Sequence, residues 1–317
     1  MSAPGLPLFV SAGEALTDLI RTGADQWASR PGGAGLNVAR AMASLGVPSA
    51  FAGAVSSDVF GQTLLESATQ AGLDTRFVQQ HARAPLVAAV FETDPPAYFF
   101  IGSDSADLQF QPDALPSGWE SAARWVHFGG ISLTREPLAT RLLNLAVRLK
   151  VAGVSISYDP NFRNVMEAGY DRMLHAMASL ADVIKVSDED LHGLFRTAQT
   201  AAALSHLQAL NPDARILFTR GAAGAEYHTN GGAWRASAPA ITVADTVGAG
   251  DASIAALLFS LMEQPDADGV EHLRYAVAAG AAACTRPGAA PPTVRQVAAL
   301  ASTVVTTRMS KTGRCAT

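Results

Sequence analysis

Residues 245–253 read DTVGAGDAS and combine two acidic side chains with a run of small residues; the apolar stretch IAALLFSLM, starting at residue 254, then has the composition of a buried helix. Small residues at 248–250 let successive backbone N–H groups point toward one spot, and the dipole of the following helix adds partial positive charge there. Such a turn can hold the negative charge that grows on a phosphoryl group during transfer. Asp251 would then either stabilise the first helical turn or accept a proton beside the anion.

A second glycine-rich stretch, RPGGAGLNVARAMASLG, covers residues 30–46. Gly32 and Gly33 would let a small ligand approach the backbone closely. Asn37 follows one helical turn later and carries a donor and an acceptor, which suit a sugar hydroxyl. A glycine-rich loop with an Asn near a helix start is also typical of ordinary helix capping, so this stretch alone indicates no ligand.

Other well-known site motifs are missing from the sequence. It contains no GxxxxGK[ST] loop, no complete GxGxxG fingerprint, no GxSxG elbow and no His/Cys pattern for zinc. The net charge is -5 and only 16% of the residues are charged, so a nucleic-acid partner is not expected. The chain starts without a signal-like segment, has two cysteines and shows no apolar run of about 20 residues, so we expect a cytoplasmic protein without a membrane partner.

The elements that must position these motifs alternate between strand-like and helix-like patterns. This alternation predicts a three-layer α/β/α Rossmann-like fold with a mainly parallel sheet covered on both faces, in which ligands bind beyond the carboxyl ends of the strands. Gly129, Asp159, Ser187 and Gly221 all follow or end predicted strands. The predicted strands are 8–13, 49–56, 125–131, 154–160, 182–187 and 215–221, and the predicted helices are 35–46, 136–153, 170–181 and 201–212.

Residues 76–110 break this alternation, because they are extended and aromatic. A double proline beside an acidic turn predicts a β-hairpin there, in a small appendage that could be a lid or a dimer surface. Residues 303–317 are polar and without pattern, so we expect a loose tail.

Taken together, these pieces resemble the ribokinase family, also called the PfkB carbohydrate kinases. The resemblance covers residues 8 to 300 and implies one ribokinase-like domain over 1–302, with a β-sheet lid formed by about 14–31 and 76–110. The two family signatures match as GGAGLNVARAMASLG (32–46) and DTVGAGDASIAALL (245–258), and further blocks match as GEALTDLI (13–20), DPNFR (159–163), ADVIKVSDEDL (181–191), TRGAAGAEY (219–227) and CTRPGAAPP (284–292).

The resemblance implies a division of labour in the second signature. Asp251 would be the catalytic base that takes the proton from a sugar hydroxyl as it attacks the γ-phosphate of ATP. The amides of Gly248, Ala249 and Gly250 would form the anion hole.

The resemblance also implies which residues face the sugar. Asp18, Gly32, Gly33 and Asn37 match the sugar-side positions, and Arg163 is a further candidate for contact with sugar or phosphate. Phe100, beside Tyr98 and Phe99 in the hairpin, would close over the sugar and exclude water.

A third set of positions matches the family's nucleotide site. Lys185 and Ser187 follow a predicted strand and would face ATP, and small residues would flank the adenine. The implied nucleotide-binding residues are Lys185, Ser187, Thr219, Gly221, Gly224, Gly250, Ala283 and Gly288.

The sequence departs from the family pattern in two places. The N-x-x-E motif, tied to magnesium, reads Ser187-Asp188-Glu189-Asp190, so Asp190 would contact Mg²⁺ through water. Val247 stands where the family usually has Thr. Asp245 and the 284–290 loop are therefore only a candidate for a monovalent cation site, such as one for K⁺.

The stretches GEALTDLI, GGISLTREP and KVSDEDL are more similar to fructokinases than to ribokinases, so fructose is the first expectation. A 2-keto-3-deoxygluconate kinase is the main alternative, with ribokinase below it, and we expect a homodimer formed through the β lid. A catalytically silent sugar- or nucleotide-binding protein is the non-enzyme alternative, and a Rossmann dehydrogenase is disfavoured by the missing fingerprint.

Overall fold

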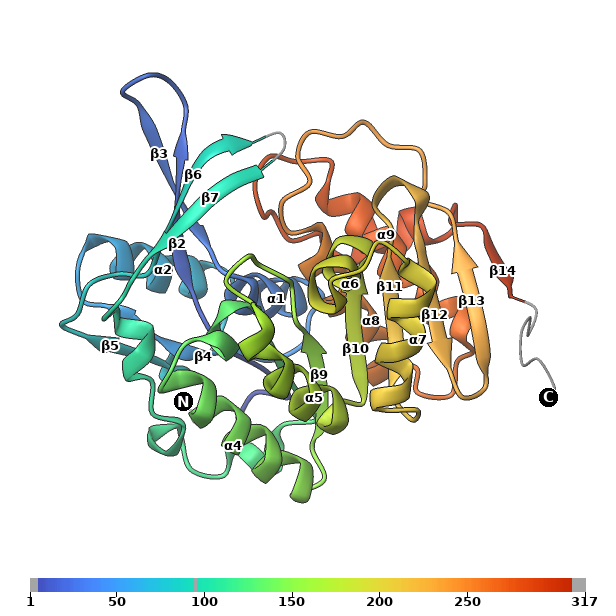
Figure 1. Cartoon of the computed structure of the whole chain (residues 1–317), viewed down its shortest axis with the longest axis horizontal. Coiled ribbons are helices and arrows are strands. Elements are labelled where there is room, and N and C mark those ends of the chain that lie inside the picture. Colours follow the sequence, from blue (N-terminus) through green and yellow to red (C-terminus); the bar gives the residue numbers. More distant parts are fainter. Residues whose placement is uncertain (1–4, 94–95, 310–317) are drawn as a thin grey trace.

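Two sheets organise the chain in the computed structural model, which describes residues 5–93 and 96–309 (Figure 1). The larger sheet has ten strands: three at one edge pair antiparallel, and the other seven are parallel to one another. In sheet order these are β14 Thr306–Arg308, β13 Gly232–Ala236, β12 Ala225–Thr229, β11 Arg215–Thr219, β10 Val183–Ser187, β9 Ser155–Asp159, β8 Trp125–Gly129, β1 Phe9–Ala12, β4 Ser49–Ser56 and β5 Val78–His81.

Helices cover both faces of this sheet, as the sequence predicts for a mainly parallel one. Alternate residues of each strand enter different cores: Val126 and Tyr158 pack on one face, whereas Trp125 and Leu217 pack on the other. The first face carries α3 Trp119–Ala122, α4 Leu138–Val151, α5 Asp171–Leu180, α6 Asp188–Phe195 and α7 Thr200–Leu210; the second carries α1 Ala34–Ser44, α2 Val59–Gln70, α8 Ala249–Glu263, α9 Gly269–Ala283 and α10 Val294–Ala301.

Local sequence explains where the helices that build the site begin. The Ser187 hydroxyl accepts from the Asp190 amide, and the Asp190 side chain accepts from the Ser187 amide, so a reciprocal capping box starts α6. Helix α8 starts at Gly248, whose φ of 79° places it in the left-handed region that favours glycine. Its next three turns are apolar on almost all sides because α8 lies between the sheet, α1 and α9.

A second sheet of four strands stands off the large one. Its order is β3 Trp27–Gly32, β2 Leu16–Arg21, β6 Val87–Thr93 and β7 Pro96–Ile101. Strands β6 and β7 pair antiparallel, as the hairpin prediction requires, although the tip at 94–95 lies outside the described residues. The pairing places Asp18 and Phe100 on one face, together with Tyr98, and turns Phe99 and Ile101 to the other.

Two ranges differ from the sequence-based expectation. Residues 78–81 form β5 on the edge of the large sheet beside β4, so the small sheet uses only 87–101 of the expected 76–110. Residues 306–308 form β14 against β13, so the start of the expected loose tail is ordered as an edge strand, and 310–317 lie outside the described residues. Both strands are three or four residues long, and tertiary pairing rather than local pattern creates them.

Among the residues that the structure describes, no helix is both long and apolar enough to cross a membrane.

Candidate active site

The two glycine-rich segments meet at the carboxyl edge of the large sheet. Helices α1 and α8 pack against each other, and the Asn37 side-chain amide donates to Asp251 Oδ2 at 3.0 Å across 214 residues of sequence. The other polar atom of this side chain, Asn37 Oδ1, is buried and has no partner among the described residues. A buried, unpaired acceptor beside a carboxylate is expected where a ligand completes the hydrogen bonding.

Several backbone N–H groups at the start of α8, close to Asp251, have no partner among the described residues. The amides of Gly248, Gly250 and Asp251 make no hydrogen bond within the described part of the chain. The Ala249 amide instead donates to Thr246 O at 3.2 Å, so this one of the three predicted anion-hole amides is engaged. A Cβ on Gly250 would lie 3.0 Å from Lys185 Nζ, which places an ammonium group directly beside the turn. The helix N-terminus and this cation together favour an anion.

The environment of Asp251 makes it a better proton acceptor than an exposed aspartate. Burial raises its pKa above the ordinary value, while the Asn37 hydrogen bond and the charges of Lys185 and Arg163 oppose that rise. A carboxylate with a raised pKa binds a proton more tightly, which suits general base catalysis.

Lys185 lies between two carboxylates at the end of β10. Its Nζ is 3.0 Å from Asp159 Oδ2 and 3.7 Å from Asp190 Oδ2, and all three side chains are buried. Burial lowers the pKa of Lys185, but the two carboxylates outweigh it and the net shift is upward, so the group stays charged. The pKa of Asp159 is raised to about 7, mainly by burial.

Asp190 is committed to structural hydrogen bonds. Its Oδ1 accepts from the Phe162 amide at 2.7 Å and its Oδ2 from the Ser187 amide at 2.7 Å, and Lys185 with these amides holds its pKa below the usual range despite burial. Within the described residues no group of three or more His, Cys, Asp or Glu side chains could hold a metal ion. Mg²⁺ commonly keeps several waters and binds through substrate phosphates rather than through a set of protein ligands alone.

The predicted sugar-side residues gather where the small sheet joins α1. A Cβ on Gly33 would lie 2.8 Å from Glu14 O, so that position requires glycine, and one on Gly32 would lie 2.2 Å from Asp18 Oδ2 and would displace that side chain. Gly33 also has a φ of 100°. Burial raises the pKa of Asp18 to about 6, against the opposing charge of Arg163.

Arg163 extends from the loop after β9 toward the small sheet. Its Nη1 donates to Asn161 O, Asn161 Oδ1 and Phe162 O, which fixes the guanidinium while its Nε and Nη2 make no hydrogen bond within the described residues. The guanidinium carbon lies 5.8 Å from the centre of the Tyr98 ring. The rings of Tyr98 and Phe100 lie edge to face on the same side of the sheet, with 5.5 Å between their centres and 70° between their planes. The structure thus brings Arg163 and the two aromatic rings together with Asp18.

The predicted nucleotide residues occupy loops to one side of Lys185. Thr219 Oγ1 donates to Val186 O at 3.4 Å, and a Cβ on Gly224 would lie 2.0 Å from Ala236 O, so that glycine permits a close crossing of two segments. Gly221 is exposed, whereas Ala283 is only 2% exposed inside α9 and has no free surface for a base.

Asp245 ties two of these loops together. It accepts from the Val247 amide at 3.0 Å and from the Gly288 amide at 2.7 Å, which joins the turn before α8 to the 284–290 loop. Val247 is 48% exposed and its side chain contributes nothing to this tie. The geometry favours support of the turn as the role of Asp245.

Sequence reasoning did not single out Glu14 and His127. Glu14 is buried and accepts from the Ser132 amide at 3.1 Å and from the Ser132 hydroxyl. His127 Nδ1 lies 2.8 Å from Ser157 Oγ, its Nε2 is buried without a partner among the described residues, and burial lowers its pKa to about 3. The available signal was a polar residue inside an otherwise apolar block, as in WVHFGG.

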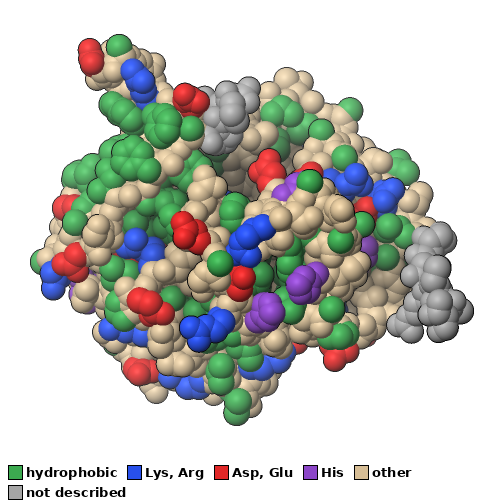
Figure 2. Space-filling model, viewed as in Figure 1, with side chains coloured by type: hydrophobic (Ala, Val, Ile, Leu, Met, Phe, Trp, Pro, Cys, Tyr) green, Lys and Arg blue, Asp and Glu red, His purple; other side chains and the backbone are tan. Residues whose placement is uncertain are grey.

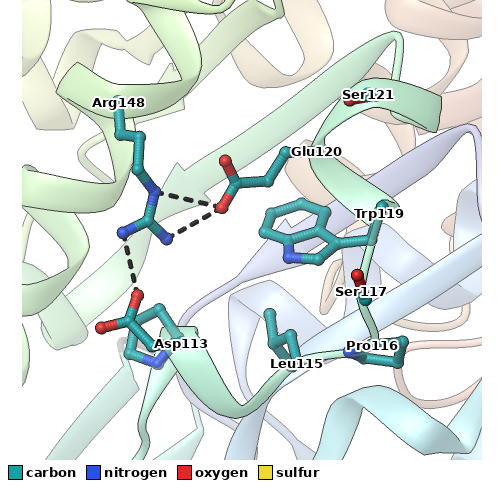
Figure 3. A pocket seen from close by; sticks show the side chains of 10 residues that line it. Asp113, Leu115, Pro116, Ser117, Trp119, Glu120, Ser121 and Arg148 are labelled. Atoms are coloured by element: carbon teal, nitrogen blue, oxygen red, sulfur yellow. Dashed lines mark hydrogen bonds and ion pairs between the residues drawn. The ribbon is translucent and has the colours of Figure 1, made fainter.

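A pocket of about 320 Å³ lies elsewhere, at the amino-terminal end of β8 (Figure 3), and is larger than the hollow of about 10 Å³ lined by Asn37, Gly248 and Asp251. The Trp119 ring lines it, and Arg148 spans it to reach Asp113 and Glu120, as the dashed lines show. Both acids neutralise this arginine, and none of the residues predicted from the glycine-rich motifs lies there. Size therefore does not mark the site in this molecule.

Comparisons with known proteins find one matching family. Residues 7–296 match the family model described as pfkB family carbohydrate kinase. The chain is 31% identical to the fructokinase of Klebsiella pneumoniae over 287 residues, which covers 87% of this chain and 93% of that protein. It is 33% identical to probable fructokinase-4 of Arabidopsis thaliana, covering 92% and 96%.

Among solved structures, the ATP-bound fructokinase of Xylella fastidiosa superimposes with a TM-score of 0.85 at 29% identity, covering 94% of this chain and 99% of that chain. These neighbours confirm the predicted fold: a mainly parallel α/β/α sheet with a small separate sheet.

Proposed function

The chain belongs to the pfkB family of carbohydrate kinases, and we propose that it is an ATP-dependent fructokinase. The observation that carries the proposal is the Asn37–Asp251 pair, which holds a carboxylate of raised pKa beside the free amides at the start of α8. Similarity to the fructokinase of Klebsiella pneumoniae supports fructose as the sugar, and similarity to the ATP-bound fructokinase of Xylella fastidiosa supports ATP as the nucleotide.

In the proposed reaction, Asp251 accepts the proton of the attacking sugar hydroxyl while the oxygen bonds to the γ-phosphorus and the bond to the leaving ADP oxygen breaks. The amides of Gly248 and Gly250 and the ammonium of Lys185 stabilise the charge on the transferring group. The Ala249 amide joins them only if its bond to Thr246 O opens.

The sugar would bind between α1 and the inner face of the small sheet. Asp18 and Asn37 Oδ1 accept hydrogen bonds from its hydroxyls, and the glycine backbone at 32–33 allows it to come close. Phe100 and Tyr98 cover it and keep water from competing for the phosphate. The free edge of the Arg163 guanidinium faces the same space and would contact a sugar oxygen or the phosphate.

ATP would occupy the loops beside Lys185 and the start of α8. We assign contacts with it to Ser187, Thr219 and Gly221, with Gly224 and Gly288 shaping the loop crossings. Ala283 would not contact ATP, because its side chain is buried; its small size lets α9 pack closely. A cytoplasmic location, where ATP is abundant, fits this use.

Mg²⁺ would be held by the ATP phosphates and water, and it would neutralise charge on the phosphates. Asp190 acts on it only at a distance, since both carboxylate oxygens bind amides. A K⁺ site would use the lone pairs of Asp245 that remain beside the 284–290 loop.

We also propose a homodimer through the outer face of the small sheet. In Figure 2 hydrophobic side chains gather where Figure 1 draws β2, β6 and β7. Trp27, Phe99 and Ile101 are 47%, 55% and 51% exposed, and Phe91 pairs with Phe99 at 6.3 Å. Water-exposed aromatic surface of this kind is typical of a protein–protein contact.

The test is ATP consumption with Mg²⁺ and a panel of fructose, ribose and 2-keto-3-deoxygluconate. Fructose should give the highest kcat/KM. A higher kcat/KM for 2-keto-3-deoxygluconate would instead indicate that the free guanidinium atoms of Arg163 bind the carboxylate of that substrate. No turnover with any member of the panel would refute the kinase proposal. Light scattering across a dilution series checks the dimer, which a Phe99→Glu variant should dissociate.

A further inference from the structure

One six-residue segment, GISLTR at 130–135, forms hydrogen bonds with two of the four chain connections between the small sheet and the rest of the molecule. The segment follows β8 and forms a tight 3-10 turn over Gly130–Thr134. It carries no residue of the proposed catalytic centre. Ile131 packs against Leu16 and Ala88 of the small sheet. The segment also makes buried polar contacts with the connections to that sheet, and each such group requires a partner.

The first connection runs from β1 to β2 and is fastened through Glu14. Its carboxylate accepts from the Ser132 amide at 3.1 Å and from the Ser132 hydroxyl, and the side chain is 2% exposed. Gly130 makes room for it, because a Cβ there would lie 2.1 Å from Glu14 Oε1. Strand β2 begins two residues after Glu14 and carries Asp18.

The second connection leaves β7 and is fastened through Arg135. Its Nη2 donates to Gly102 O at 2.6 Å, directly after the last residue of β7, and to Ser105 Oγ at 2.7 Å. Its Nε donates to Asp107 Oδ2 at 2.9 Å, and the Asp107 side chain is 1% exposed. One guanidinium therefore fixes the end of β7 and the buried carboxylate that follows it.

The hydrogen bonds of Glu14 and Arg135 affect the sugar site through the strands β2 and β7. Tyr98 lies four residues before Gly102, and Asp18 lies four residues after Glu14, a span of roughly 13 Å along a strand. The register of β2, β6 and β7 places Asp18 and Phe100 on one face. A change of angle at the base of the sheet would therefore move both groups relative to Arg163 and Asp251.

We propose that Arg135 and Glu14 are positioning residues for the sugar: by binding the connections before β2 and after β7 to the 130–135 segment, they set the angle at which Asp18, Tyr98 and Phe100 face the acceptor sugar. The proposal rests on the proposed kinase function. It requires that loss of the fastening weakens sugar binding selectively, because the predicted ATP-side groups, Lys185 and Thr219, belong to the large sheet.

The test compares Arg135→Gln with Arg148→Gln. Arg148 is the control, since it is also an arginine that forms ion pairs with acidic side chains but lies away from the small sheet. Arg135→Gln should raise KM for fructose about tenfold or more while KM for ATP changes less than about twofold, and Arg148→Gln should leave both unchanged. An unchanged KM for fructose, or an equal rise in both constants, would overturn the proposal.

Two further variants keep the test decisive if Arg135→Gln fails to fold. Arg135→Lys keeps the charge and one donor and should show a smaller rise in KM for fructose, and Ser132→Ala removes the hydroxyl donor to Glu14 and should act in the same direction. Wild-type KM values in both folded variants would refute the role.

A measurement that needs no sugar tests the role of Arg135 independently of the proposed kinase function. Amide hydrogen exchange in β2 and β7 should accelerate in Arg135→Gln and stay at the wild-type rate in Arg148→Gln. If the wild-type protein phosphorylates no sugar, the kinase proposal fails and this exchange pattern still judges the fastening. Equal exchange in all three proteins would show that Arg135 does not hold the small sheet.

Discussion

Lys185 and Arg148 are both cations between two carboxylates, at opposite ends of the large sheet. Lys185 is 7% exposed and meets Asp159 and Asp190, which are 2% and 6% exposed. Arg148 is 44% exposed and meets Asp113 and Glu120, which are 85% and 29% exposed. The composition of the two clusters is alike, and only their burial differs.

The difference in burial explains why the larger cavity, beside Arg148, is not the candidate site. Water screens the charges around Arg148, so its ion pairs change the surroundings little. In the buried cluster, burial raises the pKa of Asp159 to about 7 and also raises the pKa of Asp251, and the charge of Lys185 opposes both rises. The Lys185 ammonium also lies beside Gly250, where it can act on a phosphate.

The largest expected effect tests whether chemistry belongs to the buried end. Asp251→Asn keeps the shape and the contact with Asn37 but removes the proton acceptor, so kcat should fall about 10³-fold or more. Steady-state kinetics with fructose and ATP, and ATP binding by calorimetry, measure the two effects separately.

ATP affinity should stay within about threefold of wild type in that variant, since Asp251 contacts the acceptor side. The control is Asp113→Asn, in the exposed cluster, which should leave kcat unchanged. A folded Asp251→Asn protein with near-normal kcat would assign the carboxylate to structure alone.

The next largest effect is on stability and distinguishes Lys185 from Arg148. Lys185→Met leaves Asp159 and Asp190 buried without their partner, so the free energy of unfolding should fall by about 3 kcal/mol or more. Arg148→Met should cost less than about 1 kcal/mol, because both acids there are open to water. Urea unfolding of both variants at pH 7 measures the difference.

Similar losses in the two proteins would show that burial is not what separates these clusters. A larger loss in Arg148→Met would reverse the comparison.

The smallest effect concerns a buried acid without a cation in contact. Burial raises the pKa of Glu14 to about 7 from 4.5, so the folded state holds the proton through a range in which the unfolded state has lost it. This stabilisation is present in full below about pH 4.5 and is lost as the pH rises to about 7, with a change of up to about 3 kcal/mol.

Glu14→Gln should therefore gain stability relative to wild type as the pH rises from about 4.5 to 7 and stay constant above that range. Denaturant midpoints at four pH values measure it. A pH-independent difference between the two proteins would contradict a raised pKa at this position.

Much of the fold was predictable because its signals are local. Buried strands such as SAFAGAVS and VSISYDP read as strands wherever they occur, and the resemblance between signature segments extended this to the whole sheet. The edge strands β5 and β14 were not predictable in the same way. They contain three or four residues each and exist only through a neighbouring strand.

For the site, the sequence supplied the residue types but not their commitments. Asp245 and Asp190 were both candidates for metal contact, yet each uses two oxygens to hold backbone amides. Lys185 was expected to face the nucleotide, but nothing in its local sequence indicated that Asp159 would share its charge.

The sequence by itself determined the mainly parallel sheet, the two glycine turns and the presence of Asp251 after the second turn. Only the tertiary structure shows that Asn37 donates to that carboxylate across 214 residues and that the Ala249 amide donates to Thr246 O. The same holds for the hydrogen bond from Arg135 to Gly102 O at the end of β7. The physical reason is range: turn and strand preferences act within a few residues, whereas burial, pKa and hydrogen-bond partners depend on segments brought together only by folding.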